Sequence, residues 1–379
     1  MSRTLPKRLP VTRRRGLADP GPDHAALHRR LLAWYDRYRR DMPWRRTRDP
    51  YPVWLSEVML QQTQVATARP YYDAFIDRFP TLAALARAKT PEVLAAWAGL
   101  GYYRRARSLH EAARTVMREH DGRVPDDPEA FRRLPGVGRY TAGAVLSICF
   151  DRPLAVLDGN VARVLSRLLA LPAAIRDPRG ARRLWALADS LVPMRRPGDW
   201  NQAMMELGAT ICTPRSPACG RCPLRGSCRA LAWGRVADLP PRVGRRTPEP
   251  VRRAVALIEH GGRVLMARRE GPLLTGLWEP PGVELEDGAA AGPALRAALN
   301  RLGVRARLTP TPRTVRHTIT HRAITVEVWH GAAVSTGPRG SRVRWVGRAG
   351  DALPLTALAR KLVAAAKPSS SGRGARHAR

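Results

Sequence analysis

Hydrophobic residues in the first 230 positions follow the spacing of helices with one buried face. Apolar side chains recur every three or four residues in residues 26–38, 54–67, 82–98 and 140–150. That spacing places them on one side of a helix. Prolines lie between these segments and mark helix ends. The pattern predicts an all-helical domain at residues 23–230.

The spacing changes after residues 231–252, a stretch rich in Pro and Arg that is typical of a linker. The new pattern mixes two-residue alternation, a His-Gly-Gly turn and helical periods. Its segments are strands at residues 254–258, 264–267 and 324–329, and helices at residues 291–302 and 355–366. We expect a separate α/β domain at residues 253–367.

Composition narrows the class of protein. The 379 residues are 44% hydrophobic and 26% charged, values typical of a globular protein with a real core. Collagen-like, disulfide-scaffold and wholly disordered classes are excluded. No apolar run approaches the roughly 20 residues that span a bilayer, and the amino terminus has no export signal. We expect a cytoplasmic protein without a membrane partner.

The charge indicates a polyanionic partner. Lys and Arg number 66 against 31 acidic residues, which gives a net charge of +35. Residues 1–22 and 368–379 form basic tails that we expect to be disordered, and basic tails on a neutral enzyme would be the alternative explanation. Most of the excess lies in the body of the chain, and such an excess predicts salt-dependent binding to nucleic acid.

Four of the five cysteines are clustered. They are Cys212, Cys219, Cys222 and Cys228, separated by six, two and five residues. In a cytosolic chain this clustering indicates metal or cluster ligation rather than disulfides. A structural zinc site usually has two close pairs, whereas these spacings suit a [4Fe–4S] cluster better. Zinc stays the alternative.

A glycine pair precedes the apolar helix at residues 140–150. Gly136 and Gly138 permit a tight turn whose backbone N–H groups, at the positive end of a helix, can approach a phosphate. An ordinary turn would contain the same pair. Between two helices, however, it fits a helix-hairpin-helix that clamps the DNA backbone without reading sequence.

Three segments together resemble a known superfamily. Residues 134–147 (LPGVGRYTAGAVLS), residues 154–167 (LAVLDGNVARVLSR) and the cysteine loop at 212–228 are similar to the helix-hairpin-helix, Gly/Pro-Asp DNA glycosylases. Residues 44–65, 99–110 and 200–212 resemble the branch that removes adenine from A·G mispairs. The resemblance implies a multi-domain fold: an all-α glycosylase domain with an iron–sulfur loop, followed by a Nudix-like α/β domain.

The position after the hairpin separates two kinds of glycosylase. In the bifunctional branch of this superfamily, a lysine there attacks the sugar and forms a Schiff base. In this sequence the position is Tyr140, and no lysine occurs between Lys89 and Lys361. We therefore expect a monofunctional enzyme that removes the base and leaves the strand intact.

Two carboxylates match the chemistry of glycosidic bond hydrolysis. Glu57 lies among apolar residues that would raise its pKa, as a general acid for the adenine requires. Asp158 is the candidate anion that stabilises the cationic sugar, with Asn160 orienting the site. A solvent-facing helix Glu and a helix N-cap Asp are the alternatives. The resemblance also implies that Tyr140 lies near the reacting sugar.

Removing a base from duplex DNA requires flipping it out of the stack. The resemblance implies that Gln62 and Tyr102, with Leu60 beside them, fill the gap. It also places Trp44, Arg45 and Gln202 around the adenine. Ordinary core packing is the alternative for Tyr102 and Leu60. A surface or packing position is the alternative for Trp44, Arg45 and Gln202.

The second domain looks like a binder rather than a hydrolase. Residues 276–282 (GLWEPPG) resemble the start of a Nudix box, but residues 295–301 lack the carboxylates that hold magnesium. In the family this domain reads 8-oxoguanine, which implies that Thr320 and His321 contact the lesion. Ile319 replaces an aromatic residue there, so the A·8-oxoG preference stays open. A plain strand edge is the alternative.

Together these observations predict a monomeric, monofunctional DNA glycosylase that hydrolyses adenine opposite 8-oxoguanine or guanine in double-stranded DNA. A related glycosylase for another mismatch, such as T·G, is the first alternative. A catalytically silent iron–sulfur DNA-binding module is the second.

Overall fold

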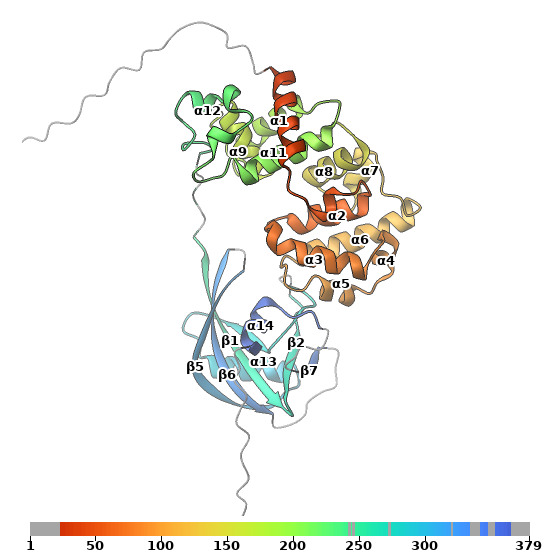
Figure 1. Ribbon diagram of the computed structural model, residues 1–379. Helices are drawn as coiled ribbons and strands as arrows, with labels where there is room; N and C mark the ends of the chain where they lie inside the picture. The colour runs from red at the N-terminus through yellow and green to blue at the C-terminus, as the bar shows by residue number, and fades with distance from the viewer. Residues whose placement is uncertain are drawn as a thin grey trace, which may run out of the picture.

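The computed structural model describes residues 23–241, 244, 247–271, 274–319, 321–333, 342–347 and 353–364. Figure 1 shows two bodies: a helical one from the first part of the chain and a sheet with two helices from the second. The tails predicted at residues 1–22 and 368–379 lie outside the described residues. No described helix is both long and apolar enough to cross a membrane.

The helical body begins several of its helices at an aspartate. Asp23, Asp49, Asp127, Asp158 and Asp177 each accept a backbone N–H with the side chain, the usual role of an N-cap. The helices are α1 (His24–Tyr38), η1 (Pro43–Arg45), α2 (Pro50–Leu60), α3 (Val65–Arg78), α4 (Leu82–Arg87), α5 (Thr90–Ala96), α6 (Arg104–Glu119), α7 (Pro128–Arg133), α8 (Arg139–Phe150), α9 (Gly159–Leu168), α10 (Pro178–Leu191), α11 (Pro197–Thr210) and α12 (Arg229–Ala232).

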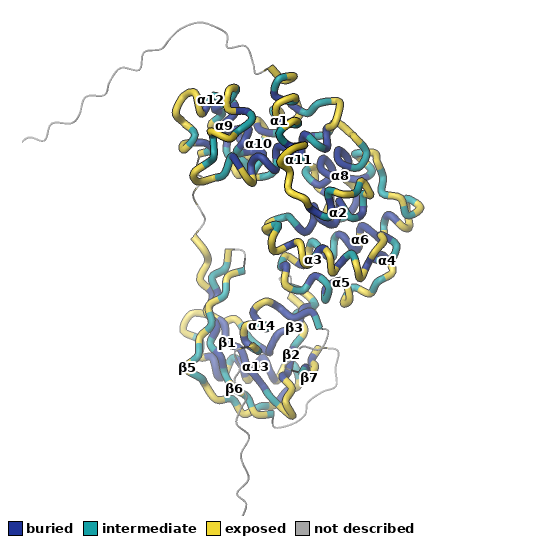
Figure 2. The backbone as a smooth tube through the Cα atoms, in the orientation of Figure 1, coloured by how far each residue is buried: buried dark blue, intermediate teal, exposed yellow. Residues whose placement is uncertain are grey.

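Helix α8 lies between two apolar cores. The first core is formed by residues from α2, α3, α4, α5, α6 and α7. The second is formed by residues from α1, α9, α10 and α11. On α8, Val145 packs into the first core and its neighbour Ala144 into the second. Figure 2 shows this helix buried near the middle of the helical body. Burial on all sides explains why the sequence of α8 is an almost unbroken apolar run.

Two predicted helices are each broken by a turn. Residues 54–67 divide into α2 and α3, with Gln62 in the left-handed region at φ 59°. Residues 82–98 divide into α4 and α5, where Pro91 lacks the N–H that would continue a helix. The apolar spacing continues across both turns, so spacing alone does not reveal where one helix ends and the next begins.

The second body is a seven-stranded sheet with the order β3-β2-β1-β6-β5, to which β4 adds on β1 and β7 on β2. Strands β1 and β6 run parallel and the other pairs antiparallel. The elements are β1 (Glu249–His260), β2 (Arg263–Arg268), β3 (Trp278–Glu279), β4 (Gly282–Leu285), α13 (Ala291–Arg301), β5 (Ala306–Ile319), β6 (Arg322–Ala333), β7 (Val343–Gly347) and α14 (Ala357–Ala364). Helices α13 and α14 cover opposite faces of the sheet, each over its own apolar core.

The two bodies are in direct contact. The Tyr103 hydroxyl donates a hydrogen bond of 3.3 Å to the Leu355 carbonyl, and Arg360 of α14 donates to the Ala98 carbonyl at 3.2 Å. Leu277, from the second body, is fully buried within the first apolar core of the helical body. The bodies therefore share packed surface, in addition to the chain that connects them.

Candidate active site

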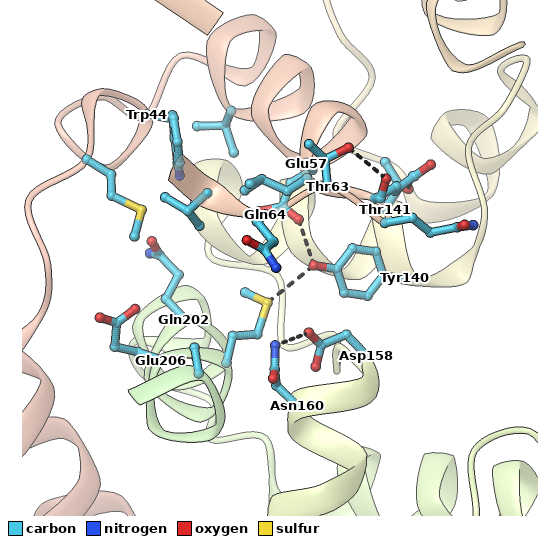
Figure 3. A pocket seen from close by; sticks show the side chains of 18 of the residues that line it. Trp44, Glu57, Thr63, Gln64, Tyr140, Thr141, Asp158, Asn160, Gln202 and Glu206 are labelled. Carbon is cyan, nitrogen blue, oxygen red and sulfur yellow. Dashed lines mark hydrogen bonds between the residues drawn. The ribbon is translucent and has the colours of Figure 1, made fainter. Parts of the chain in front are cut away.

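A cavity of about 1150 Å³ lies where the two cores of the helical body meet. Its walls come from α2, the turn after α2, the hairpin before α8, the start of α9 and one face of α11 (Figure 3). Most of the residues singled out in the sequence line it: Trp44, Arg45, Glu57, Leu60, Gln62, Gly136, Gly138, Tyr140, Asp158, Asn160 and Gln202. Segments from both ends of the helical body's sequence thus converge on one pocket.

Glu57 is a buried carboxyl in this pocket. It projects from α2 with 5% of its surface exposed, and Tyr140 donates a hydrogen bond of 2.8 Å to its Oε2 atom. Burial raises the pKa of Glu57 to about 7, while the hydrogen bond from Tyr140 and the charge of Arg45 oppose the rise. The negative charge of Asp158 acts in the same direction as burial. Glu57 therefore carries a proton for much of the time near neutral pH.

Asp158 has two roles that its position makes compatible. Its Oδ1 accepts the Val161 N–H at 2.7 Å and so caps α9, while its Oδ2 accepts from the Asn160 amide at 2.9 Å. Burial raises the pKa of Asp158, and these hydrogen bonds oppose the rise. The carboxylate still lines the pocket, so the cap holds it at the cavity wall.

Tyr140 lies in the first turn of α8 between the two acids. Its hydroxyl is 2.8 Å from Glu57 and 3.2 Å from the sulfur of Met205 on α11. Burial, together with both carboxyls, raises the pKa of Tyr140 well above its usual value. The phenol therefore stays neutral and acts as a donor toward Glu57 (Figure 3).

The hairpin between α7 and α8 uses its two glycines differently. Gly136 has a φ of 78°, and a Cβ there would lie 2.5 Å from the Cβ of Ser108, so only glycine fits. Gly138 has an ordinary φ, and a Cβ there would meet nothing within 4 Å. Both line the cavity. The helix start at α8 thus presents its free N–H groups on an open side, as anion binding requires.

Glu206 is a buried acid that sequence reasoning missed. It is 1% exposed, lines the pocket from α11, and makes ion pairs of 2.6 Å with Arg40 and 2.9 Å with Arg45. The pairing holds the pKa of Glu206 below its usual range despite burial. A single Glu within the apolar run MMELGA was the same signal that drew attention to Glu57, and it was available in the sequence.

The other residues of this wall are Trp44 and Gln202. Trp44 is buried and packs edge-to-face on Tyr72, with 5.0 Å between ring centroids. Trp44 therefore does have the packing role that was the alternative interpretation, and it also lines the cavity. Gln202 projects into the cavity from α11, on the same helix as Glu206 (Figure 3).

Two predicted contact groups lie apart from the cavity. Tyr102, 42% exposed and at φ 48°, is in the turn before α6 and does not line the cavity. His321 is in the β5–β6 turn of the second body, with a side chain that is 66% exposed and 3.6 Å from Glu249. Thr320 lies outside the described residues. The structure therefore does not join Tyr102 or His321 to the two acids.

The four cysteines surround a small cavity next to α9. Its lining also includes Arg167, Ile211, Leu231 and Val236. Arg167 is buried, donates to the Thr213 carbonyl at 2.7 Å, and lies 3.4 Å from Cys212 Sγ, so a positive charge faces the thiols. Within the described ranges, no three His, Cys, Asp or Glu side chains could hold one metal ion. Separated thiols around a cavity fit a cluster better than a single zinc.

Arg163 connects the cysteine loop to the acid site. Its guanidinium donates to the Cys212 carbonyl at 2.7 Å and to the Asn160 side-chain oxygen at 2.9 Å. Asn160 in turn donates to Asp158. Three hydrogen bonds, through Arg163 and Asn160, thus link the Cys212 carbonyl to the Asp158 carboxylate.

Fold and site together define a base-excision DNA glycosylase. Residues 55–189 match the HhH-GPD superfamily of base excision DNA repair proteins, residues 212–228 the iron-sulfur binding domain of endonuclease III, and residues 253–365 the NUDIX domain. A solved thermostable thymine-DNA glycosylase superposes with a TM-score of 0.51 at 31% identity, covering 55% of this chain and 97% of that one.

The chain belongs to the adenine DNA glycosylase family. It is 39% identical to the adenine DNA glycosylase of Rattus norvegicus, covering 86% of this chain and 74% of the relative. The identity to the human enzyme is also 39%, covering 82% and 69%. The protein is therefore an enzyme of base excision repair that acts on DNA, with a [4Fe–4S] cluster at the cysteine loop. The predicted fold class, enzyme class and cofactor are confirmed.

Proposed function

We propose that this glycosylase hydrolyses adenine opposite 8-oxoguanine or guanine, and that Glu57 and Asp158 perform the chemistry. The observation that carries this proposal is the presence of both acids in one cavity, one of them with a pKa near 7. A general acid works best when its pKa is close to the working pH. An anion beside the sugar then stabilises the cationic transition state.

The proposed reaction uses one proton from the enzyme. The Glu57 carboxyl protonates a ring nitrogen of adenine, and the glycosidic bond breaks with its electron pair moving to the base. Asp158 stabilises the positive sugar, which water then attacks at the anomeric carbon while losing a proton to solvent. Tyr140 holds the Glu57 carboxyl in place, and Asn160 does the same for Asp158.

The absence of a suitable amine supports a monofunctional reaction. The described lining of the cavity contains no lysine, and Tyr140 occupies the position where a Schiff-base lysine would lie. A covalent link to the sugar would need such an amine. Base release without strand cleavage is the expected outcome.

We assign the remaining contacts to two domains of a monomer on duplex DNA. Residues 23–230 would clamp the backbone through Gly136 and Gly138 and hold the flipped adenine among the side chains that line the cavity. In that domain Gln62, Leu60 and Tyr102 would fill the gap in the stack, and Trp44, Arg45 and Gln202 would surround the base. Residues 253–367, joined by the linker at residues 231–252, would read 8-oxoguanine through Thr320 and His321.

A T·G glycosylase is the second candidate, because a thymine-DNA glycosylase shares the helical fold. Single-turnover excision on A·8-oxoG, A·G and T·G duplexes decides between them. We expect excision from the first two and none from T·G, with strand breaks only after alkali treatment. Excision of thymine at a rate equal to adenine would overturn the substrate assignment, and excision by Glu57→Gln at the parental rate would remove the proposed acid.

A further inference from the structure

Arg105 makes an unusual number of hydrogen bonds for one side chain. It lies in the first turn of α6, and its two terminal nitrogens donate to five backbone carbonyls and one hydroxyl. The acceptors are the carbonyls of Val58, Met59, Gln61, Leu100 and Gly101, and the hydroxyl of Thr63, at 2.5 to 3.3 Å. One guanidinium therefore connects two stretches of chain about 40 residues apart.

The first stretch is the C-terminal end of α2 and the turn after it. The last carbonyls of a helix have no partner within the helix and need an outside donor. Arg105 supplies that donor to Val58 and Met59, in the same helical turn as Glu57. The next residues form the turn that carries Gln62.

The second stretch is the turn before α6, residues 99–103. Arg105 donates to the carbonyls of Leu100 and Gly101, and its charge lies 5.5 Å from the ring centroid of Tyr102 and 5.4 Å from that of Trp97. A positive charge over an aromatic face is attracted by the ring. The same side chain thus fixes the backbone and the ring of this turn.

Each of these turns contains a residue in a strained conformation. Gln62 has a φ of 59° and Tyr102 a φ of 48°, a region that side chains other than glycine rarely adopt. Such conformations persist only where the surroundings enforce them. Arg105 is the group that contacts both turns. The two strained residues are also two of the three that we assign to the gap in the DNA stack, the third being Leu60.

Helix stability does not explain an arginine at this position. A cation in the first turn faces the positive end of the helix dipole, where an acidic side chain would be favoured, and the first turn of α6 has no acid. Burial lowers the pKa of Arg105 to about 10, so the side chain stays charged at neutral pH. Within the described residues its Nε is buried without a partner. The six acceptors and the rings of Trp97 and Tyr102 offset the cost of this placement.

We propose that Arg105 is a positioning residue that holds the turns of Gln62 and Tyr102 as one rigid unit at the end of the Glu57 helix. The proposal rests on the proposed function, because it assumes that these two side chains enter the DNA stack. Without Arg105 the two turns relax independently. Flipping of the target base then suffers, while binding to undamaged duplex does not.

The test measures flipping separately from bond cleavage. A duplex with 2-aminopurine in place of the target adenine reports unstacking as a rise in fluorescence, and single-turnover excision from an A·8-oxoG duplex reports the whole reaction. In Arg105→Gln we expect both the fluorescence rise on flipping and the single-turnover excision rate to fall by about tenfold to a hundredfold. Misplaced reacting groups typically have a cost of this size. Duplex affinity, iron content and circular dichroism should stay close to the parent. Arg105→Lys keeps the charge but not the fork of donors, so it should recover only part of the signal.

Arg104→Gln is the matched control, since it removes the same charge from an exposed neighbouring position and should flip like the parent. A parental fluorescence rise in Arg105→Gln would refute the positioning role. If that variant does not fold, a parental rise in Arg105→Lys refutes it, and a reduced rise with full iron content supports it. Parental flipping in both Gln62→Ala and Tyr102→Ala would instead refute the wedge assignment on which the proposal rests.

Discussion

Glu57 should destabilise the enzyme at alkaline pH, and Glu57→Gln should remove that cost. A carboxyl whose pKa rises on folding binds its proton more tightly in the native state. Folding stability is then lost as pH rises from the usual pKa of the carboxyl to the raised one. Here the pKa moves from 4.5 to about 7. At 1.36 kcal/mol per unit, the shift is worth about 3 kcal/mol, and the loss is complete above pH 7.

The glutamine variant carries no such penalty, and its amide can still accept the Tyr140 hydrogen bond. We expect it to be more stable than the parent by about 3 kcal/mol at pH 8 and by about 1 kcal/mol at pH 5.5. For a domain of this size the first value corresponds to a rise in Tm of about 6 to 12 °C. Excision should fall by about 10²- to 10⁴-fold, the usual contribution of a general acid.

The assay is thermal unfolding of both proteins at both pH values and at one scan rate, followed by circular dichroism. Glu129→Gln, an exposed glutamate of α7, serves as control and should show no gain at either pH. A gain of equal size at both pH values would mean that the pKa of Glu57 is not raised. A less stable variant at pH 8 would mean that the buried carboxylate is well solvated or fully paired.

Three further outcomes follow from the same geometry. Tyr140→Phe removes a hydrogen bond that lowers the pKa of Glu57, so the alkaline limb of the pH–rate profile, near pH 7 in the parent, should move to higher pH; an unmoved limb would contradict the contact. Tyr140→Lys should give a borohydride-trapped adduct with DNA, whereas the parent should give none. His321→Ala should lower the ratio of A·8-oxoG to A·G excision rates by about tenfold, the worth of one hydrogen bond to a lesion, and a parental ratio would remove His321 from lesion reading.

Much of the candidate site was predictable because a polar cavity places titratable side chains at positions where folding alone would favour apolar ones. A glutamate within an apolar helix and an aspartate before a helix start can both be recognised from the sequence alone. Asp158 caps α9 and also lines the cavity, so its N-cap position is compatible with the role that we propose for it beside the sugar. Glu206 carried the same signal within α11 and was missed, although it shapes the charge of the site.

Other features depended on contacts that sequence spacing does not contain. The turn between α2 and α3 is hidden, because apolar residues keep their helical period across it. Arg105, which comes from another helix, donates a hydrogen bond to the Gln61 carbonyl in this turn. The link from Cys212 through Arg163 to Asn160 is equally invisible, since it depends on how α9 packs against the cysteine loop. Long-range polar contacts of this kind leave no periodic pattern in the sequence, so periodicity cannot predict them.

The contact between the two bodies determines how lesion reading should be tested. Leu277 directly precedes β3 of the Nudix-like domain, yet it is fully buried in the core of the helical body. Emptying a buried leucine site costs about 2–5 kcal/mol. Deleting the second domain would therefore weaken the fold around the start of α6, where Tyr103 is the N-cap residue and Arg105 lies in the first turn. A lost preference for 8-oxoguanine in such a truncation would not identify the groups that read the lesion. Point variants in the full chain keep Leu277 in place, and they are the experiment that separates recognition from stability.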